Sequence, residues 1–264
     1  MAPSSPILLF DSGVGGLTVL AELRKLLPDA PVIYAADTAG LPYGDKTEAE
    51  VAARVAGLLG VLSERYKPRL ATIACNTAST IALGMVRDVL QIPIVGTVPA
   101  IKPASALTRS GTIGLLGTAA TIRQRYVDNL EAEFAAGKRL VRYPAPGLVA
   151  AAEAKLRGDP FDQAAIEEAV SGLRSEAGGG EIDTVVLACT HFPLLAEELS
   201  RVLGDGVVLV DGAKGIAARV ASLVGGDSLA RTGPDTAVFT AEPDIRPQFA
   251  EALARYGLER IERL

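Results

Sequence analysis

Short runs of β-branched and other apolar residues alternate with longer segments of helical periodicity along this chain. The short runs predict strands at Ile7–Phe10, Val32–Ala35, Leu70–Ala74, Ile92–Val95, Thr112–Leu116, Thr184–Ala188, Val207–Val210 and Ala237–Thr240. The segments between them predict helices at Leu17–Leu27, Glu48–Arg65, Thr77–Leu90, Thr121–Ala135, Asp162–Glu176, Pro193–Leu203 and Ala213–Leu223. This alternation is typical of α/β proteins, whose mostly parallel sheets carry helices on both faces. Ligand sites in such sheets lie at the carboxyl ends of the strands.

Two kinds of strand end occur twice in the sequence. LLFDSGVGG (8–16) and GLLGTAAT (114–121) both end in a turn of small residues, whereas TIACNTAST (72–80) and VLACTHFPL (186–194) both end in Ala-Cys and a polar turn. Strand-turn-helix units are common, but a cysteine at the same place in each copy is less easily a coincidence. We therefore expect two similar α/β domains, one formed by residues 1–97 plus 210–264 and the other by residues 98–209.

Composition excludes several classes of protein. The 264 residues include 31 acidic and 26 basic side chains, a net charge of −5, which argues against a nucleic-acid partner. Two cysteines cannot form a disulfide-rich scaffold, and with a single histidine a zinc site would need carboxylate ligands. The longest uncharged stretch, Leu70–Val86, is too short and too polar to span a membrane, and the N-terminus resembles no export signal. We expect a cytoplasmic protein with reduced thiols.

Both cysteines are candidates for a reactive role. A free cysteine is most often a small buried side chain. However, Cys75 and Cys189 each follow a predicted strand and precede a polar turn into a helix, where free N–H groups lower the pKa of a thiol. The only histidine, His191, lies two residues after Cys189 and could share its proton. Asp11 ends the first strand and could do the same for Cys75, or it could simply cap the following helix.

Two loops are candidates for ligand binding. The turn DSGVGG (11–16) lacks the Lys-Ser/Thr of a P-loop and the spacing of a dinucleotide fingerprint, so its bare N–H groups suit a carboxylate as well as a phosphate. PYGDK (42–46) is either a plain turn or a loop that closes over a small ligand.

These residues carry a close resemblance to the glutamate racemases, which belong to the superfamily of cofactor-independent amino-acid racemases. The matching segments fall in order over residues 7–213: FDSGVGGLTV (10–19), YAADTAGLPYGDK (34–46), ACNTAS (74–79), GTVPAIKPA (96–104), LLGTAATIRQRY (115–126), LACTHFPLL (187–195) and VDGA (210–213). ACNTAS combined with CTHFPLL is the specific part of the match. The resemblance implies two pseudo-symmetric domains with the active site between them.

The resemblance also implies roles for individual residues. Cys75 and Cys189 would be acid/base thiols on opposite faces of the substrate Cα, with Asp11 assisting Cys75 and with His191 and Glu153 assisting Cys189. The substrate's carboxylates and ammonium would be bound by Asp11, His191, Ser12, Pro42, Tyr43, Gly44, Asn76, Thr77, Thr118, Thr121 and Thr190. Two opposed bases suit racemisation, because a proton leaves one face of Cα while another arrives at the opposite face. Neither a cofactor nor a metal is expected, since the sequence shows no lysine motif of PLP enzymes and no metal-ligand cluster.

Some features depart from the family pattern. Ala36 and Ala188 stand where the family usually has glycine, and the alanine beside Cys189 is expected to tighten the pocket. PGLVAAAE (146–153) lacks a proline that is common there, and Asp211 is not expected to be catalytic. The charged segment Pro243–Leu264 is predicted to form a solvated helix on the first half, or to contribute to a homodimer.

The predicted function is interconversion of L- and D-glutamate for bacterial peptidoglycan synthesis. Three alternatives remain open: a racemase of a related amino acid such as aspartate, a non-catalytic ligand-binding protein of two lobes, and a thiol redox protein. The ligand-binding alternative leaves the paired cysteines unexplained. The redox alternative is weak, since 114 residues separate Cys75 from Cys189 and there is no C-x-x-C motif.

Overall fold

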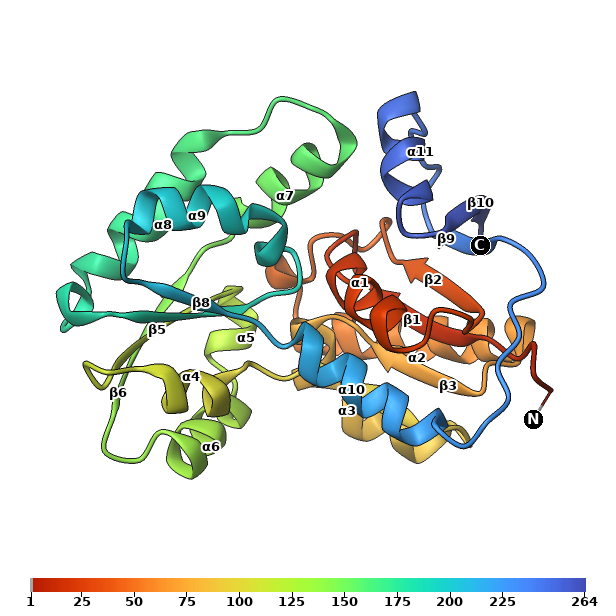
Figure 1. The fold of residues 1–264 in the computed structure, drawn as a ribbon, viewed down its shortest axis with the longest axis horizontal. Coiled ribbons are helices and arrows are strands. Elements are labelled where there is room, and N and C mark those ends of the chain that lie inside the picture. The colour runs from red at the N-terminus through yellow and green to blue at the C-terminus, as the bar shows by residue number, and fades with distance from the viewer. Residues whose placement is uncertain (1) are drawn as a thin grey trace.

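The computed structural model describes residues 2–264, which form two halves that each contain one parallel sheet (Figure 1). The larger sheet has the strand order β10 (Leu258–Arg263), β9 (Asp235–Phe239), β2 (Val32–Ala36), β1 (Ile7–Asp11), β3 (Leu70–Ile73) and β4 (Ile94–Gly96). The smaller sheet has the order β6 (Arg139–Pro144), β5 (Thr112–Gly117), β7 (Thr184–Ala188) and β8 (Val208–Val210). Every adjacent pair of strands is parallel, which confirms the predicted fold class.

The two sheets share an internal order. Strands β2-β1-β3-β4 of the larger sheet correspond to β6-β5-β7-β8 of the smaller one. In this correspondence β3 matches β7, so the two cysteines follow equivalent strands, as the repeat predicted. The predicted domain boundaries at residues 97/98 and 209/210 stay a prediction.

Helices cover both faces of both sheets. The larger sheet packs against α1 (Leu17–Leu26), α10 (Ala213–Val224) and α11 (Pro247–Ala254) on one face, and against α2 (Glu48–Tyr66) and α3 (Asn76–Val89) on the other. The smaller sheet packs against α7 (Gly147–Arg157), α8 (Gln163–Ser175) and α9 (Ala196–Leu203) on one face, and against α4 (Ile101–Leu107), α5 (Ala119–Ile122) and α6 (Arg125–Phe134) on the other. Short 3₁₀ helices are η1 (Tyr43–Asp45), η2 (Gly179–Glu181) and η3 (Phe192–Leu195).

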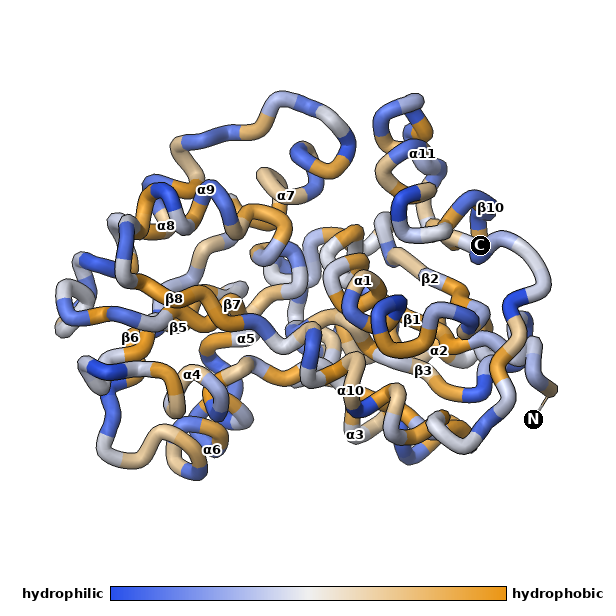
Figure 2. The backbone as a smooth tube through the Cα atoms, viewed as in Figure 1, coloured by the Kyte–Doolittle hydropathy of each residue, from blue (hydrophilic) through white to orange (hydrophobic). Residues whose placement is uncertain are grey.

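Strand β1 shows why its sequence is apolar throughout. Ile7 and Leu9 enter the core beneath α1 and α10, whereas Leu8 and Phe10 enter the core beneath α2 and α3. Successive side chains of a strand point to opposite faces, so a central strand with two covered faces has no polar side. Hydrophobic residues accordingly concentrate along the strands inside both halves (Figure 2).

Several predicted elements were wrong in type or extent. The predicted helix Thr121–Ala135 is divided into α5 and α6, because Gln124 has an extended backbone and starts the second helix. The predicted helix Pro193–Leu203 is split between η3 and α9. The C-terminal segment Pro243–Leu264 is not one helix: α11 is followed by Gly257 and then by β10, which pairs with β9.

The elements that the sequence did not predict are β6, β10, α4 and α7, whereas α11 lies inside the predicted C-terminal helix. Strands β6 and β10 are edge strands in which only Val141 and Leu258, respectively, are fully buried, so their sequences RLVRYP and LERIER carry charges. Edge strands of this kind lack the apolar run that marked the central ones. Within residues 2–264, no helix combines the length and apolar character that a membrane span requires.

Candidate active site

The carboxyl ends of the central strands of both sheets meet at one narrow cavity between the halves. Cys75 follows β3 as the first residue before α3, and Cys189 directly follows β7. The cavity is lined by Ser12, Pro42, Tyr43, Gly44, Cys75, Thr77, Thr118, Val149, Cys189 and His191. All of these except Val149 were predicted from the sequence. Both thiols therefore face one cavity, one from each half.

The predicted residues that do not line this cavity lie next to it. Asp11, Thr121 and Glu153 are buried and contact lining residues through hydrogen bonds. Asn76 and Thr190 border a second small pocket that also reaches Cys189. The structure thus brings all fourteen predicted residues to one region. Ala188 is different, because it packs into the core beneath α4 and does not line the cavity, so the expected tightening is wrong.

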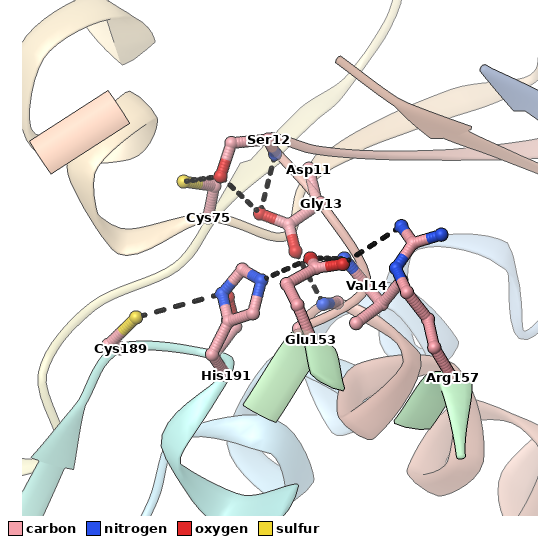
Figure 3. A network of polar contacts seen from close by, with 12 residues as sticks. Asp11, Ser12, Gly13, Val14, Cys75, Glu153, Arg157, Cys189 and His191 are labelled. Atoms are coloured by element: carbon pink, nitrogen blue, oxygen red, sulfur yellow. Dashed lines mark hydrogen bonds and ion pairs between the residues drawn. The ribbon is translucent and has the colours of Figure 1, made fainter. Parts of the chain in front are cut away.

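A carboxylate and a hydroxyl lie beside Cys75. Ser12 Oγ lies 3.8 Å from Cys75 Sγ, and Asp11 Oδ1 accepts a 2.7 Å hydrogen bond from the Ser12 N–H (Figure 3). Asp11 Oδ2 accepts a second bond, of 2.6 Å, from the Gly16 N–H. Asp11 therefore holds the turn into α1 through the Gly16 N–H and lies beside the thiol, and its assistance to Cys75 stays a prediction.

The pKa of Cys75 is shifted upwards, contrary to the prediction. Burial raises the pKa of the thiol well above its usual range, and the neighbouring Asp11 raises it further. A hydrogen bond from the Ala78 N–H at the start of α3 acts in the opposite direction but is outweighed. Burial also raises the pKa of the Asp11 carboxyl. The sequence indicated the helix start correctly but could not indicate how completely the thiol is buried.

An imidazole and a second carboxylate lie beside Cys189. His191 Nδ1 is 3.8 Å from Cys189 Sγ, and His191 Nε2 is 2.9 Å from Glu153 Oε1 on α7. Burial alone would lower the pKa of His191, but the hydrogen bonds with Cys189 and Glu153 raise it well above its usual range. Burial alone would likewise raise the pKa of Glu153, but contact with His191 holds it below the ordinary value. The two thiols therefore have chemically different partners.

The turn after β1 approaches this second cluster closely. The Val14 N–H donates a 2.8 Å hydrogen bond to Glu153 Oε1 across the interface between the halves. A Cβ atom at Gly13 would lie 2.1 Å from that carboxylate oxygen, and one at Gly15 would lie 2.5 Å from the backbone nitrogen of His191. Gly13 and Gly15 are therefore required for contact with the other half.

Three threonine hydroxyls form a cluster that joins the halves. Thr77 Oγ1, at the start of α3, lies 2.9 Å from Thr118 Oγ1 and 3.2 Å from Thr121 Oγ1, both from the smaller half. Asn76 Oδ1 and Thr190 Oγ1 are also buried, and neither has a hydrogen-bond partner among the residues that the structure describes. These side chains retain donors and acceptors suited to carboxylates and an ammonium group.

The loop PYGDK closes one side of the cavity. The Tyr43 ring lines the cavity, while its hydroxyl donates a 2.6 Å hydrogen bond to Asp37, which also pairs with Arg54. A Cβ at Gly44 would lie 3.0 Å from Thr118 Cβ, so this position approaches the opposite half. Asp37 is a residue that the sequence did not reveal, and it anchors the loop from behind.

Other missed contributors are the Val14 N–H, Val149 and Arg157. Arg157 donates a 3.0 Å hydrogen bond to Glu153 Oε2 from one helical turn away. The spacing of Glu153 and Arg157 is a common helical ion pair, which could have signalled this contact if α7 had been predicted. Asp211 accepts a bond from the Ala213 N–H and so caps α10. In the described part of the chain, no three His, Cys, Asp or Glu side chains are grouped to hold a metal ion.

Comparison with known proteins gives three kinds of match. The Asp/Glu/Hydantoin racemase family matches residues 18–220. A glutamate racemase from Sphingopyxis alaskensis is 60% identical over 262 residues, which cover 99% of this chain and 98% of that protein. Escherichia coli glutamate racemase, crystallised with L-glutamate and the activator UDP-MurNAc-ala, superposes with a TM-score of 0.90 at 42% identity, covering 98% of each chain. Francisella tularensis glutamate racemase in complex with D-glutamate gives a TM-score of 0.77 at 25% identity, covering 100% and 98%.

Proposed function

Because the chain belongs to the Asp/Glu/hydantoin racemase family, we propose that it interconverts L-glutamate and D-glutamate. The observation that carries this proposal is the pair of buried thiols that face one cavity from equivalent strands of two similar sheets. The relatives crystallised with L-glutamate and with D-glutamate support the choice of substrate.

In the proposed reaction, one cysteine thiolate removes the Cα proton from one face of glutamate. The electron pair stays on the substrate as a carbanion, and the other cysteine, as a thiol, delivers its proton to the opposite face. The thiol and thiolate are then exchanged, so the reverse reaction uses the same groups in opposite roles. General acid–base catalysis of this kind contributes roughly 10²–10⁴-fold to the rate.

The neighbouring residues would serve this proton transfer in two ways. Asp11 with Ser12 and His191 with Glu153 would move or hold the proton at Cys75 and at Cys189, respectively. Ser12, Asn76, Thr77, Thr118 and Thr190 would bind the carboxylates and the ammonium group and stabilise the developing charge. Burial of these groups supports the proposal, since hydrogen bonds to a developing charge are strongest where water is excluded.

The test is incubation of the purified protein, without added PLP, with each enantiomer of glutamate in deuterated water. We expect the optical rotation of L-glutamate and that of D-glutamate each to decay to zero, and the product to carry deuterium at Cα. Parallel incubations with L- and D-aspartate test the related substrate. If neither amino acid is inverted or exchanged, the racemase proposal is wrong, and tight glutamate binding without turnover would support the binding-protein alternative.

Two variants test the assignment of the thiols. Cys75→Ser and Cys189→Ser should each reduce inversion of glutamate by roughly 10²–10⁴-fold. The chain has no third cysteine to serve as a matched control, so thermal unfolding of each variant must show that it is folded. Inversion near the wild-type rate in either folded variant would contradict the two-thiol mechanism.

The proposed reaction would supply D-glutamate to cytoplasmic enzymes of peptidoglycan synthesis. Rescue of a bacterial D-glutamate auxotroph by this chain, but not by its Cys75→Ser variant, tests that role.

A homodimer formed through the C-terminal segment is also a proposal. Light scattering tests it, because a dimer would have twice the 27.3 kDa mass of the chain.

Regulation by a nucleotide activator is a second proposal, favoured by one groove outside the active site. The groove has a volume of about 900 Å³ and is lined by apolar side chains, by the cations Lys102, Lys214 and Arg219, and by the carboxylates Glu133 and Asp211. These three cations suit a diphosphate, and the groove shares Asp211, Gly212 and Ile216 with the pocket beside Cys189. The activator bound to the E. coli relative is a nucleotide of this chemistry.

The activator proposal is tested by measuring racemisation with and without UDP-MurNAc-L-alanine. We expect kcat/KM to rise, and the rise to be lost when Lys214 and Arg219 are replaced by glutamine. Equal rates with and without the nucleotide, together with no heat of binding in calorimetry, would contradict regulation at this groove.

A further inference from the structure

Helices α7 and α11 form a contact between the halves that is separate from the catalytic cavity. Helix α7 covers the smaller sheet and α11 covers the larger one, and the two face each other in Figure 1. Arg246, just before α11, forms two hydrogen bonds of 2.5 and 2.6 Å with Asp159, just after α7. The Arg157 guanidinium carbon lies 4.4 Å from the centroid of the Phe249 ring on α11. An ion pair and a cation–π contact thus hold the end of α7 against the other half.

Arg157 also contacts the cluster at Cys189. Its Nη2 atom lies 3.0 Å from Glu153 Oε2, while Glu153 Oε1 lies 2.9 Å from His191 Nε2. His191 Nδ1 in turn lies 3.8 Å from Cys189 Sγ. Contacts therefore run without a break from Phe249, in the larger half, to the thiol in the smaller half (Figure 3 shows them from Arg157 onwards).

We propose that Arg157 is a positioning residue for proton transfer at Cys189, and that Phe249 holds it in place from the opposite half. Arg157 fixes one oxygen of Glu153 so that the other faces His191. The Cys189 side of the site is then fully assembled only when α7 and α11 are in contact. This inference rests on the proposed racemase function.

The side-chain chemistry supports arginine in this role. A guanidinium is planar, so one face can stack on Phe249 while its edge donates to Glu153, which a lysine ammonium cannot do equally well. Arg157 is also a charge close to a buried carboxylate, and its side chain is only 20% exposed. Phe249 is fully buried and packs against Phe239, which fixes the ring in place. Arg157 does not line the cavity, so substrate binding should depend on it little.

Loss of Arg157 should alter the titration of His191. The ionisable groups around the His191–Glu153 pair are Asp11, Tyr34, Cys189 and Arg157. Among them Arg157 is the only cation, and it lowers the pKa of Glu153. Without it, the Glu153 carboxylate can turn away from His191, which weakens the hydrogen bond that raises the pKa of His191. We expect this loss to outweigh the opposite effect of removing a nearby positive charge, so the pKa of His191 should fall. The alkaline limb of kcat against pH should then move to lower pH.

The experiment compares wild type with Arg157→Met, Arg157→Lys and Phe249→Leu. The matched control is Arg255→Met, which removes an exposed arginine directly after α11 that pairs with Glu251. Arg157→Met should lower kcat at least tenfold with KM changed less than twofold, because a misplaced proton donor costs about this much. The kcat of Arg157→Lys should lie between those of Arg157→Met and wild type. Phe249→Leu should lower kcat less than Arg157→Met does, and the kcat of the control should equal that of wild type.

A second measurement does not depend on activity. The chain contains one histidine, so the NMR titration of an isotope-labelled, untagged sample reports His191 alone. The midpoint should be lower in Arg157→Met than in wild type and intermediate in Arg157→Lys. The inference is overturned if the folded variants keep both the wild-type midpoint of His191 and the wild-type kcat. A lower melting temperature with both of these values unchanged would also overturn it, because Arg157 would then serve stability alone. A wild-type protein that inverts no glutamate would instead overturn the proposed function.

Discussion

Gly15 illustrates how a single residue determines whether the two halves can meet. A Cβ there would lie 2.5 Å from the His191 backbone nitrogen and 2.7 Å from the Thr190 carbonyl carbon. Backbone atoms cannot turn aside as a side chain can, so Gly15→Ala should destabilise the protein by about 1–3 kcal/mol and lower kcat. Chemical denaturation and the glutamate assay measure the two effects.

The control for this prediction is Gly57→Ala. Gly57 lies within α2, and nothing is within 4 Å of the position a Cβ would take. Alanine is a better helix former than glycine, so this variant should be more stable by about 0.5–1 kcal/mol and fully active. Equal stability of the two variants would show that the close approach at Gly15 does not affect the free energy of unfolding.

The buried pair His191–Glu153 should make stability depend on pH. The pKa of His191 is raised above its ordinary value of 6.5 in the folded state, so its stabilisation is fully present below pH 6.5 and lost as the pH rises through the folded-state value. The pKa of Glu153 is lowered from 4.5, so its stabilisation is present above pH 4.5 and lost as the pH falls through the folded-state value.

His191→Gln tests this dependence. The difference in the free energy of unfolding between wild type and variant should be largest between pH 4.5 and 6.5 and should decrease at higher pH. Urea denaturation at a series of pH values measures it. A difference that stays constant up to pH 9 would mean that His191 is neutral in the folded protein.

Individual residues differ in how far the sequence could reveal them. Cys75, Cys189, Asp11 and Thr118 were predictable because each ends or follows a central parallel strand, and such strand ends meet at one edge. The raised pKa of Cys75 was not predictable, since it depends on how completely the folded chain buries the thiol and on the neighbouring Asp11. Arg157 and Asp37 were missed because they act from behind the residues that line the cavity.

The start of helix α2 shows that a local capping motif can contribute stability without lining the cavity. Thr47 Oγ1 accepts a hydrogen bond from the Glu50 N–H, and Glu50 accepts one from the Thr47 N–H, which together form a capping box. Thr47→Ala should cost about 0.5–2 kcal/mol in the free energy of unfolding, as losses of helix caps do, with kcat unchanged.

Thermal or urea unfolding of Thr47→Ala measures this cost. Thr232→Ala serves as the control, because Thr232 is exposed and lies outside any helix or strand. The control should lie within about 0.5 kcal/mol of wild type. If both variants have the same stability, the capping box does not stabilise α2 in solution.

At the scale of elements, the predictable strands were those buried on both faces. Strands β1, β3, β5 and β7 are fully buried, so their apolar runs indicated them directly. Strand β10 has the sequence LERIER, whose apolar residues three apart are also typical of an amphipathic helix. It is a strand because β9 offers it a parallel edge, which is information outside the segment itself.

At the scale of the whole molecule, the narrow cavity implies that the halves must separate for glutamate to reach the thiols. Cys75 and Cys189 are 5% and 7% exposed, so alkylating reagents reach them only in an opened state. Minor states of this kind are commonly populated at about 0.1–10%, so alkylation should be roughly 10- to 1,000-fold slower than in the unfolded chain. Mass spectrometry after iodoacetamide treatment measures both rates.

If glutamate binds between the halves as proposed, it should favour the closed state and slow this alkylation further. L-alanine at the same concentration is the control, since it lacks the side-chain carboxylate. Alkylation as fast as in the unfolded chain would show that the thiols are freely accessible and that no opening is needed.

The matched strand orders of the two sheets have a thermodynamic consequence. In the proposed reaction they present two thiols to one substrate carbon, but Asp11 accompanies one thiol and His191 the other, so the two directions of reaction need not share the same kcat. Enantiomers have equal free energies in water, and the equilibrium constant between them is therefore one. Any difference in kcat between the two directions must then be matched by an equal ratio of KM, so the unequal partners can change how tightly each enantiomer is held but never which one accumulates.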